Sequence, residues 1–148
     1  MFTHILVATD GSALAAHSLE KGVALAKALS ARVTIVHVTE LWSISEMASN
    51  AEMGDLHPVD DYETKAGAAA TKILDAARKT AEAAGVKCET LHVADARPAE
   101  GIVSAATRNG CDLIVMASHG RRGLSRLVLG SQASEVLAHA KIPVLICP

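Results

Sequence analysis

Short apolar runs alternate along the chain with segments whose apolar residues recur at three- and four-residue steps. The runs are rich in β-branched residues, and their continuous apolar character predicts strands that are buried on both faces of a sheet. Five strands are predicted, at residues 4–9, 32–38, 86–93, 111–117 and 142–147. The third strand alternates polar with apolar residues, which places it at an edge of the sheet.

A segment with helical spacing follows each of the first four predicted strands. The first helix begins after Ser12, whose hydroxyl is suited to cap a helix. The other helices are expected at about residues 62–84, at 98–108 and at 131–140. The connection over residues 39–61 has no steady period, and a connection of this length in a compact domain is usually functional or mobile.

Strictly alternating strands and helices predict one α/β domain over residues 1–148, with an open five-stranded parallel sheet and helices on both faces. Right-handed crossovers leave few topologies, and strand order 3-2-1-4-5 places the reversal of chain direction between the first and fourth strands. Ligands of open α/β sheets bind at such a reversal, beyond the carboxyl ends of the strands. The predicted crevice therefore lies between Thr9-Asp10 and Met116-Ala117.

Composition and charge narrow the classes of function. A net charge of −2 and an aromatic content of 2% provide neither a basic field for nucleic acid nor a platform for stacking bases. Cys88, Cys111 and Cys147 are far apart and form no C-x-x-C pair, so reduced cysteines in a cytoplasmic protein are expected. No signal peptide is expected, and no apolar run approaches the roughly 20 residues of a membrane helix.

Common catalytic and metal-binding motifs are absent from the sequence. It contains no GxxxxGK[ST], no GxGxxG and no GxSxG, which excludes the P-loop, the dinucleotide fingerprint and the usual nucleophile elbow. The seven histidines form no HxxxH or HExxH pattern, so no protein metal site is expected.

Residues 116–134 combine three glycines, three arginines and four serines at the predicted crevice. Gly120 is followed by nine residues and then by Gly130-Ser131, where a helix is predicted to begin. The unpaired N–H groups and positive dipole of a helix amino terminus attract phosphate, and glycine lets the backbone approach an anion closely. The alternative is that the glycines only form turns and that Ser131 is a plain helix cap.

Several side chains near the crevice allow two interpretations. Asp10 either caps the following helix or faces the ligand, where it binds a ribose or holds a divalent metal between phosphates. Arg121, Arg122 and Arg126 either clamp a polyphosphate or form a solvated cationic loop. His119 either contacts a phosphate or packs in the turn.

A resemblance to the universal stress protein family is carried by VATDGS (residues 7–12), IVHV (35–38), DLIVMASHGRRGLSRLVLGSQASEVL (112–137) and IPVLIC (142–147). It extends over essentially the whole chain. Nucleotide-binding members carry Gly, two residues, Gly, nine residues, then Gly with Ser or Thr. The resemblance implies bound ATP, with Mg²⁺ as a candidate companion, phosphates at Gly120 and Gly130-Ser131, Asp10 near the nucleoside, and the backbone around Val38 at the adenine.

The resemblance and the predicted crevice together define a set of candidate ligand-binding residues. They are Ala8, Thr9, Asp10, Val38, Met116, Ala117, Ser118, His119, Gly120, Arg122, Gly130, Ser131, Gln132, Ala133 and Ser134.

Ala117 stands where the nucleotide-binding members have their first glycine. A Cβ at this position costs little if φ is negative and the ligand is not pressed against it. With a positive φ, alanine is disfavoured by roughly 1 kcal/mol or more.

These observations predict a dimeric stress-response or regulatory protein that binds an adenine nucleotide. The alternatives are a dimerisation scaffold without nucleotide and a slow ATPase, and slow or absent turnover is expected because no convincing general base is found. The last strand, 142–147, is apolar and lies at the end of the sheet, where exposed edges invite pairing. The resemblance implies a homodimer across this strand, and the alternative is an edge covered within one subunit.

Overall fold

The computed structural model describes residues 1–40, 54, 58–120 and 128–148. The candidate ligand residue Arg122 lies outside these ranges, together with Arg121, Gly123 and Arg126. Most of the predicted 39–61 connection lies outside them as well.

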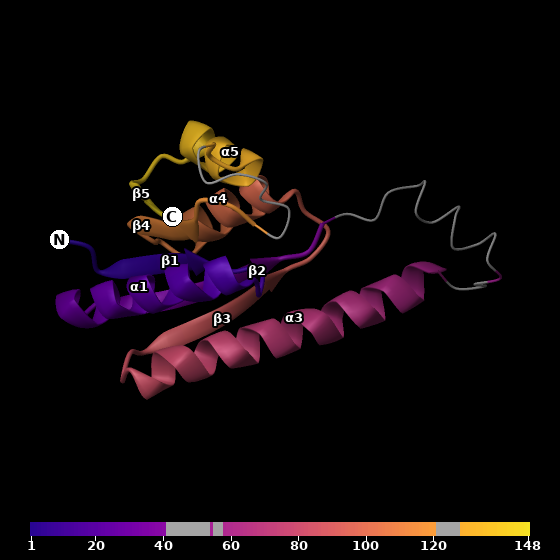
Figure 1. The fold of residues 1–148 in the computed structure, drawn as a ribbon, viewed down its shortest axis with the longest axis horizontal. Helices are drawn as coiled ribbons and strands as arrows, with labels where there is room; N and C mark the ends of the chain where they lie inside the picture. Colours follow the sequence, from indigo (N-terminus) through magenta and orange to yellow (C-terminus); the bar gives the residue numbers. More distant parts are fainter. Residues whose placement is uncertain (41–53, 55–57, 121–127) are drawn as a thin grey trace.

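Within the described chain, five strands form one open, all-parallel sheet in the order β3-β2-β1-β4-β5 (Figure 1), which confirms the predicted topology. The strands are β1 (His4–Ala8), β2 (Arg32–Val38), β3 (Cys88–Val93), β4 (Leu113–Ala117) and β5 (Val144–Cys147). The helices are α1 (Ala13–Leu29), α3 (Pro58–Ala83), α4 (Pro98–Arg108) and α5 (Ser131–His139). Helix α3 begins earlier than its apolar spacing predicted.

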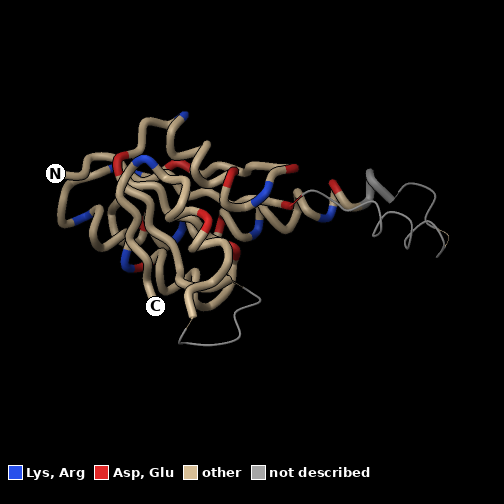
Figure 2. The backbone as a smooth tube through the Cα atoms, turned by 90° about the horizontal axis from the view of Figure 1, so that it is seen from above, with Lys and Arg blue, Asp and Glu red and all other residues tan. Residues whose placement is uncertain are grey.

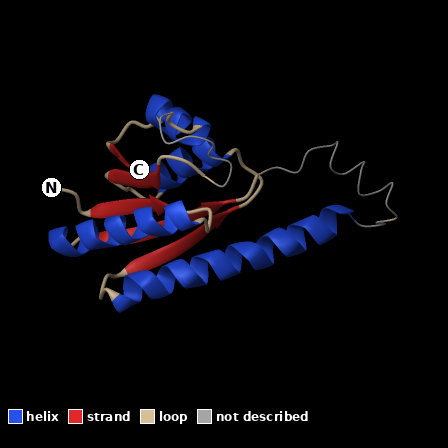
Figure 3. Cartoon of the chain, viewed as in Figure 1, coloured by secondary structure: helices blue, strands red, loops and turns tan. Residues whose placement is uncertain are grey.

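Helices cover both faces of the sheet, as predicted (Figure 3). Alternate residues of a strand point to opposite faces, so Ile5 and Val7 pack under α1 and α3 while Leu6 and Ala8 pack under α4 and α5. Burying a side chain such as Ile5 or Leu6 completely contributes about 1.5–3 kcal/mol. Acidic and basic residues are scattered along the described backbone (Figure 2).

Helices α1, α3 and α4 end in the same way. A residue in the left-handed region follows each helix: Ser30 with φ 55°, Gly85 with φ 74° and Gly110 with φ 64°. The next residue then turns its N–H back to the helix, as Val86 does to the Ala81 carbonyl oxygen at 3.0 Å. Because this turn occupies the residues after each helix, β3 and β4 begin two residues later than their apolar patterns predicted.

Two glycines let helices approach opposite faces of the sheet closely. A Cβ added at Gly22 of α1 would lie 2.9 Å from a γ-methyl of Val7, and one added at Gly101 of α4 would lie 2.8 Å from a γ-methyl of Val38. Both added atoms would meet buried or half-buried strand side chains. Because Gly22 and Gly101 have no side chain, α1 and α4 can lie close to the strands that carry the crevice.

His4 is a buried histidine at the amino end of β1, far from the crevice. Its Nε2 lies 2.8 Å from Thr34 Oγ1, and its Nδ1 has no partner among the described residues. Burial lowers the pKa of His4, and the charge of Arg32 lowers it further, whereas Asp112 and Glu89 raise it.

We predict that Gly22→Ala destabilises the protein by about 1–3 kcal/mol, because the added methyl overlaps Val7 in a packed core. Gly67→Ala in α3 is the matched control, since nothing lies within 4 Å of its added Cβ. The control is expected to gain up to about 1 kcal/mol from the higher helix propensity of alanine. Denaturant unfolding measures both variants, and similar effects of the two substitutions would contradict this packing account.

We also predict that stability falls in mild acid through His4. Its folded-state pKa lies below the ordinary value of 6.5, so the unfolded chain binds more protons below that pH. The contribution of neutral His4 is thus fully present above pH 6.5 and is lost, by up to about 1.4 kcal/mol per pH unit, as the pH falls. Unfolding of His4→Val between pH 7 and pH 5 should show a shallower loss than the parent protein, and equal slopes would disprove the assignment.

Candidate functional site

A cavity of about 540 Å³ opens at the carboxyl ends of β1, β2 and β4, where the chain direction reverses. Its volume lies within the range usual for small-molecule sites. The strand ends form one side of it, and parts of α3, α4 and the start of α5 form the rest. The predicted crevice is therefore hollow in the structure.

The cavity brings together most of the residues that the sequence predicted for the site. Its lining includes Ala8, Thr9, Asp10, Val38, Met116, Ala117, Ser118, His119, Gly120, Gly130, Ser131, Gln132 and Ala133. Ser134 is exposed and is not part of the lining, and its N–H donates to the Gly130 carbonyl oxygen at 2.9 Å as the first bond of α5. Arg122 lies outside the described residues.

Asp10 forms a turn between β1 and α1. Its Oδ1 accepts the Ser12 N–H at 2.9 Å, and Gly11 between them has a φ of 78° that favours glycine. Ser12 is the residue that caps α1, because its Oγ accepts the Ala15 N–H at 3.2 Å. Asp10 Oδ2 faces Gly120, where an added Cβ would lie 3.1 Å from it. The carboxylate therefore lies between the ends of β1 and β4.

Gly130 is required by a backbone contact. Its N–H donates to the Ser118 carbonyl oxygen at 2.9 Å, and a Cβ added at Gly130 would lie 2.8 Å from the same oxygen. Its φ of −61° is open to any residue, so close approach and not conformation selects glycine. A larger residue at Gly130 would disturb this loop whether or not a ligand binds, so substitution there does not test ligand binding.

The first turn of α5 presents backbone donors to the cavity. Gly130 is the N-cap and has no side chain to accept them. The N–H groups of Ser131, Gln132 and Ala133 precede the first helical hydrogen bond and meet no acceptor among the residues that the structure describes. Three such donors at the positive end of a helix dipole form an attractive site for an anion.

Ala117 carries no conformational penalty. It ends β4 in register with Cys147 of β5, and the only non-glycine residues with positive φ in the described chain are Ser30 and Asp95. The extended backbone accepts a Cβ, so the alanine costs little by itself. Its methyl group limits only how closely a ligand can approach this point of the cavity.

The histidine of β2 at the cavity was not among the predicted site residues. His37 Nδ1 lies 2.9 Å from the Thr9 carbonyl oxygen, which can only accept, so Nδ1 carries the proton and Nε2 is the remaining acceptor of the neutral ring. The ring stacks on His92 of β3 with centroids 6.0 Å apart. Burial, and then the neighbouring His37, lower the pKa of His92, whose Nε2 lies 2.7 Å from Thr39 Oγ1.

The lining also includes residues of β2, of the two positions after it, of α3 and of α4 that the sequence did not identify. They are Val36, His37, Thr39, Glu40, Tyr62, Ala66, Ala69, Ile73, Pro98 and Ile102. The position of β2 beside β1 was a usable signal, because its carboxyl end faces the same edge of the sheet. Nothing in the spacing of α3 indicated that it extends past the strand ends, as Figure 1 shows.

The described lining combines acidic side chains with the amino terminus of α5. Asp10 and Glu40 are its acidic side chains, and it contains no lysine or arginine. No group of three or more His, Cys, Asp or Glu side chains with metal-binding geometry occurs among the described residues. In the same part of the chain, no helix combines the length and the apolar character needed to cross a membrane. Within the described lining, the amino terminus of α5 attracts an anion, whereas Asp10 and Glu40 oppose one.

Sequence comparison gives matches over the entire chain. The model of the Universal stress protein family matches residues 1–148. Universal stress protein YxiE of Bacillus subtilis is 35% identical over 147 residues, which cover 99% of this chain and 99% of YxiE. The universal stress protein in the QAH/OAS sulfhydrylase 3' region of Thermus aquaticus is 37% identical over 152 residues, covering 99% of this chain and 98% of the relative.

Solved structures with the same fold match over similar lengths. The structure of the hypothetical protein MJ0577 has a TM-score of 0.79 at 29% identity and covers 99% of this chain and 95% of its own. A universal stress protein in complex with cAMP has a TM-score of 0.69 at 24% identity, with 99% and 96% covered. The universal stress protein from Archaeoglobus fulgidus in complex with dAMP has a TM-score of 0.66 at 19% identity, with 97% and 96% covered.

Proposed function

Because the chain belongs to the universal stress protein family, we propose that the cavity at the carboxyl ends of β1 and β4 binds an adenine nucleotide, with ATP as the expected ligand. The observation that carries the proposal is the open first turn of α5 at this cavity, which offers three backbone donors to a phosphate. Two structures of the same fold hold adenine nucleotides, cAMP in one and dAMP in the other.

The proposed orientation places the phosphates at the donors and the adenine at β2, with Asp10, which faces Gly120, between them. The phosphates lie at Gly120 and at the first turn of α5, where the donors are. The nucleoside lies toward Asp10, with the adenine at the backbone around Val38, since both residues line the cavity. The Asp10 carboxylate suits either a ribose hydroxyl or a Mg²⁺ ion, and such an ion would be held mainly by the phosphates.

We propose a binding role and not a catalytic one. His119 Nδ1 lies 2.9 Å from Ser118 Oγ, and Asp10 Oδ1 accepts the Ser12 N–H, so each side chain has a local structural contact that accounts for its position without a catalytic role. With slow or absent hydrolysis, the protein acts as a nucleotide-dependent regulatory or stress-response protein of the cytoplasm. A dimeric scaffold that binds no nucleotide would not account for the three N–H groups of α5 that lack an acceptor among the described residues.

We further propose that two copies pair across β5, the last strand of the sheet. Leu145 on β5 is 41% exposed, and Leu137 on the neighbouring α5 is 45% exposed. Exposed apolar edge strands are unfavourable in water and pair readily with another chain. A two-fold axis beside β5 would bury these leucines against their copies.

Calorimetry with ATP and magnesium tests the ligand. We expect micromolar binding to the parent protein, and weakening by about tenfold or more in Ser131→Asp, because a carboxylate at this position repels phosphate. The same substitution favours the helix dipole, so the fold should keep its stability. Ser131→Ala is the matched neutral control, and adenosine, which has no phosphate, should bind both variants equally.

Two results would reject the ligand proposal. No heat and no shift in melting temperature up to millimolar ATP would reject nucleotide binding by this protein. Unchanged ATP affinity in Ser131→Asp would place the phosphates away from α5.

Sedimentation tests the dimer. We expect the parent protein to sediment as a dimer at micromolar concentration and Leu145→Lys to sediment as a monomer, since burying an unpaired ammonium in an apolar interface is costly. Ala28→Lys on the exposed face of α1 is the matched control and should remain dimeric. A monomeric parent protein, or a dimer that survives Leu145→Lys, would disprove pairing across β5.

A further inference from the structure

Two helices, α4 and α5, begin at the same cavity. Pro98, the first residue of α4, lines it together with Ser131, Gln132 and Ala133 of α5. Each amino terminus carries a positive dipole end and N–H groups without helical partners, so each is a candidate to hold the anionic end of a ligand. The two termini differ in whether a protein group accepts their N–H groups.

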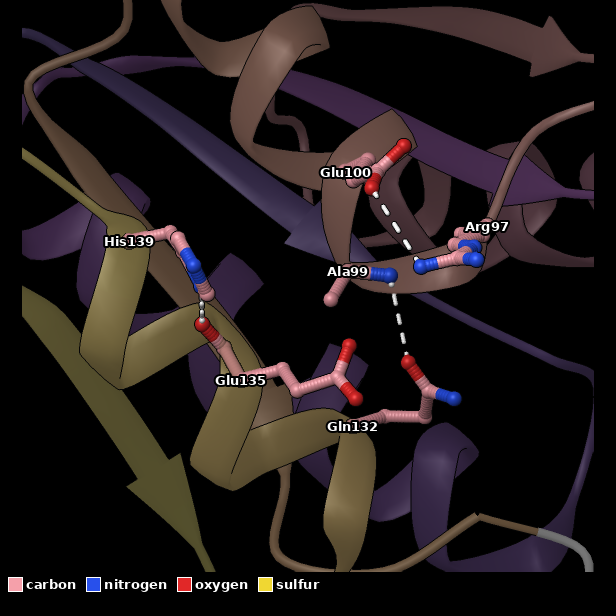
Figure 4. A network of polar contacts seen from close by, with 6 residues as sticks. All are labelled: Arg97, Ala99, Glu100, Gln132, Glu135 and His139. Carbon is pink, nitrogen blue, oxygen red and sulfur yellow. Dashed lines mark hydrogen bonds and ion pairs between the residues drawn. The ribbon is translucent and has the colours of Figure 1, made fainter.

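A side chain of α5 contacts the amino terminus of α4 at one buried donor, while the Glu100 N–H meets no acceptor among the described residues. The N-cap residue of α4, Arg97, makes no side-chain capping bond, and Pro98 has no N–H. The Ala99 N–H is the next donor, and Gln132 Oε1 accepts it at 3.2 Å (Figure 4). Ala99 is only 3% exposed, so water is a poor substitute for this acceptor. Arg97 and Glu100 form a charged pair at 3.9 Å beside it, and both side chains are exposed.

Gln132 also belongs to the open terminus. It is the second residue of α5, and its own backbone N–H is one of the three donors that meet no acceptor in the described chain. The backbone of Gln132 lies at the cavity, and its side chain extends to α4. Figure 4 shows the side-chain amide oxygen directed at Ala99. A displacement of α5 relative to α4 would therefore both break the Ala99 bond and move the donors.

We propose that Gln132 is a positioning and specificity residue for the anionic end of the ligand. Its side-chain oxygen occupies the buried Ala99 donor of α4, so that this amide holds no phosphate. The same bond fixes the first turn of α5, so that the amides of Ser131, Gln132 and Ala133 keep one arrangement toward phosphate. The inference rests on the proposed nucleotide function and adds a role for a side chain of this chain.

Two substitutions of Gln132 distinguish the effect of losing the Ala99 hydrogen bond from the effect of adding a negative charge. Gln132→Met keeps the length of the side chain and removes the acceptor, so the Ala99 amide should exchange its hydrogen faster and ATP should bind about fivefold to tenfold more weakly. Adenosine should bind Gln132→Met nearly as well as the parent protein, because it makes no contact at α5. Gln132→Glu keeps the acceptor, so Ala99 should stay protected, while the added charge should weaken ATP and not adenosine.

Amide hydrogen exchange followed by NMR, combined with the affinity ratio of ATP to adenosine, decides the inference. If Gln132 has only a structural role, its substitution will lower the melting temperature and both affinities together. The ratio of ATP affinity to adenosine affinity would then stay unchanged, and this result would overturn the inference. Loss of Ala99 protection when the parent protein binds ATP would also overturn it, because the side chain would then have turned to the phosphate. If the parent protein binds no ATP, both the proposed function and the positioning role of Gln132 fail. Protection of the Ala99 amide still reports whether the bond between Ala99 and Gln132 exists. If the parent protein binds ATP and Gln132→Met is unchanged, only the present inference fails.

Discussion

All strands of the sheet are parallel, and the amino termini of α1, α4 and α5 are therefore brought to one edge, beside the carboxyl ends of the strands. Each terminus carries backbone N–H groups that the helix cannot satisfy, and buried donors without acceptors are costly. The structure meets this constraint differently at each helix. Ser12 accepts the Ala15 N–H of α1, Gln132 accepts the Ala99 N–H of α4, and the first turn of α5 is left open at a cavity of about 540 Å³. The candidate ligand site is the one helix terminus of the three that has no protein acceptor among the described residues.

Hydrogen bonds connect this open terminus to the sheet and to α4. The Ser118 carbonyl oxygen holds the Gly130 N–H, and Ser118 in turn donates its N–H to the Cys147 carbonyl oxygen at 2.8 Å. Asp10 closes the turn after β1 and faces Gly120 across the crevice. The donors of α5 are thus positioned by β4, β5 and α4 together, and little reorganisation is needed when an anion binds.

The fold and part of the site were predictable from local patterns. Continuous apolar runs and helical spacing identify each strand and helix, and the alternation of the two leaves few topologies. The starts of β3 and β4 were predicted two residues early, because Val86 and Cys111 are apolar yet turn back to the preceding helix. Thr9, Asp10 and Met116 were predictable as cavity residues since they end adjacent strands at the reversal. His37 and the bond between Gln132 and Ala99 depend on contacts between distant segments, which spacing along one segment does not reveal.

The central claim is that the open amides of α5 receive the anionic end of a nucleotide. Backbone amide NMR shifts recorded during titration with ATP and magnesium test it most directly. The account predicts that the largest changes occur at Ser131, Gln132 and Ala133, with further changes at Asp10 and Gly120 and little change at His4 on the opposite edge. Shifts that leave residues 131–133 unmoved while others respond, or no response at millimolar ATP, would contradict it.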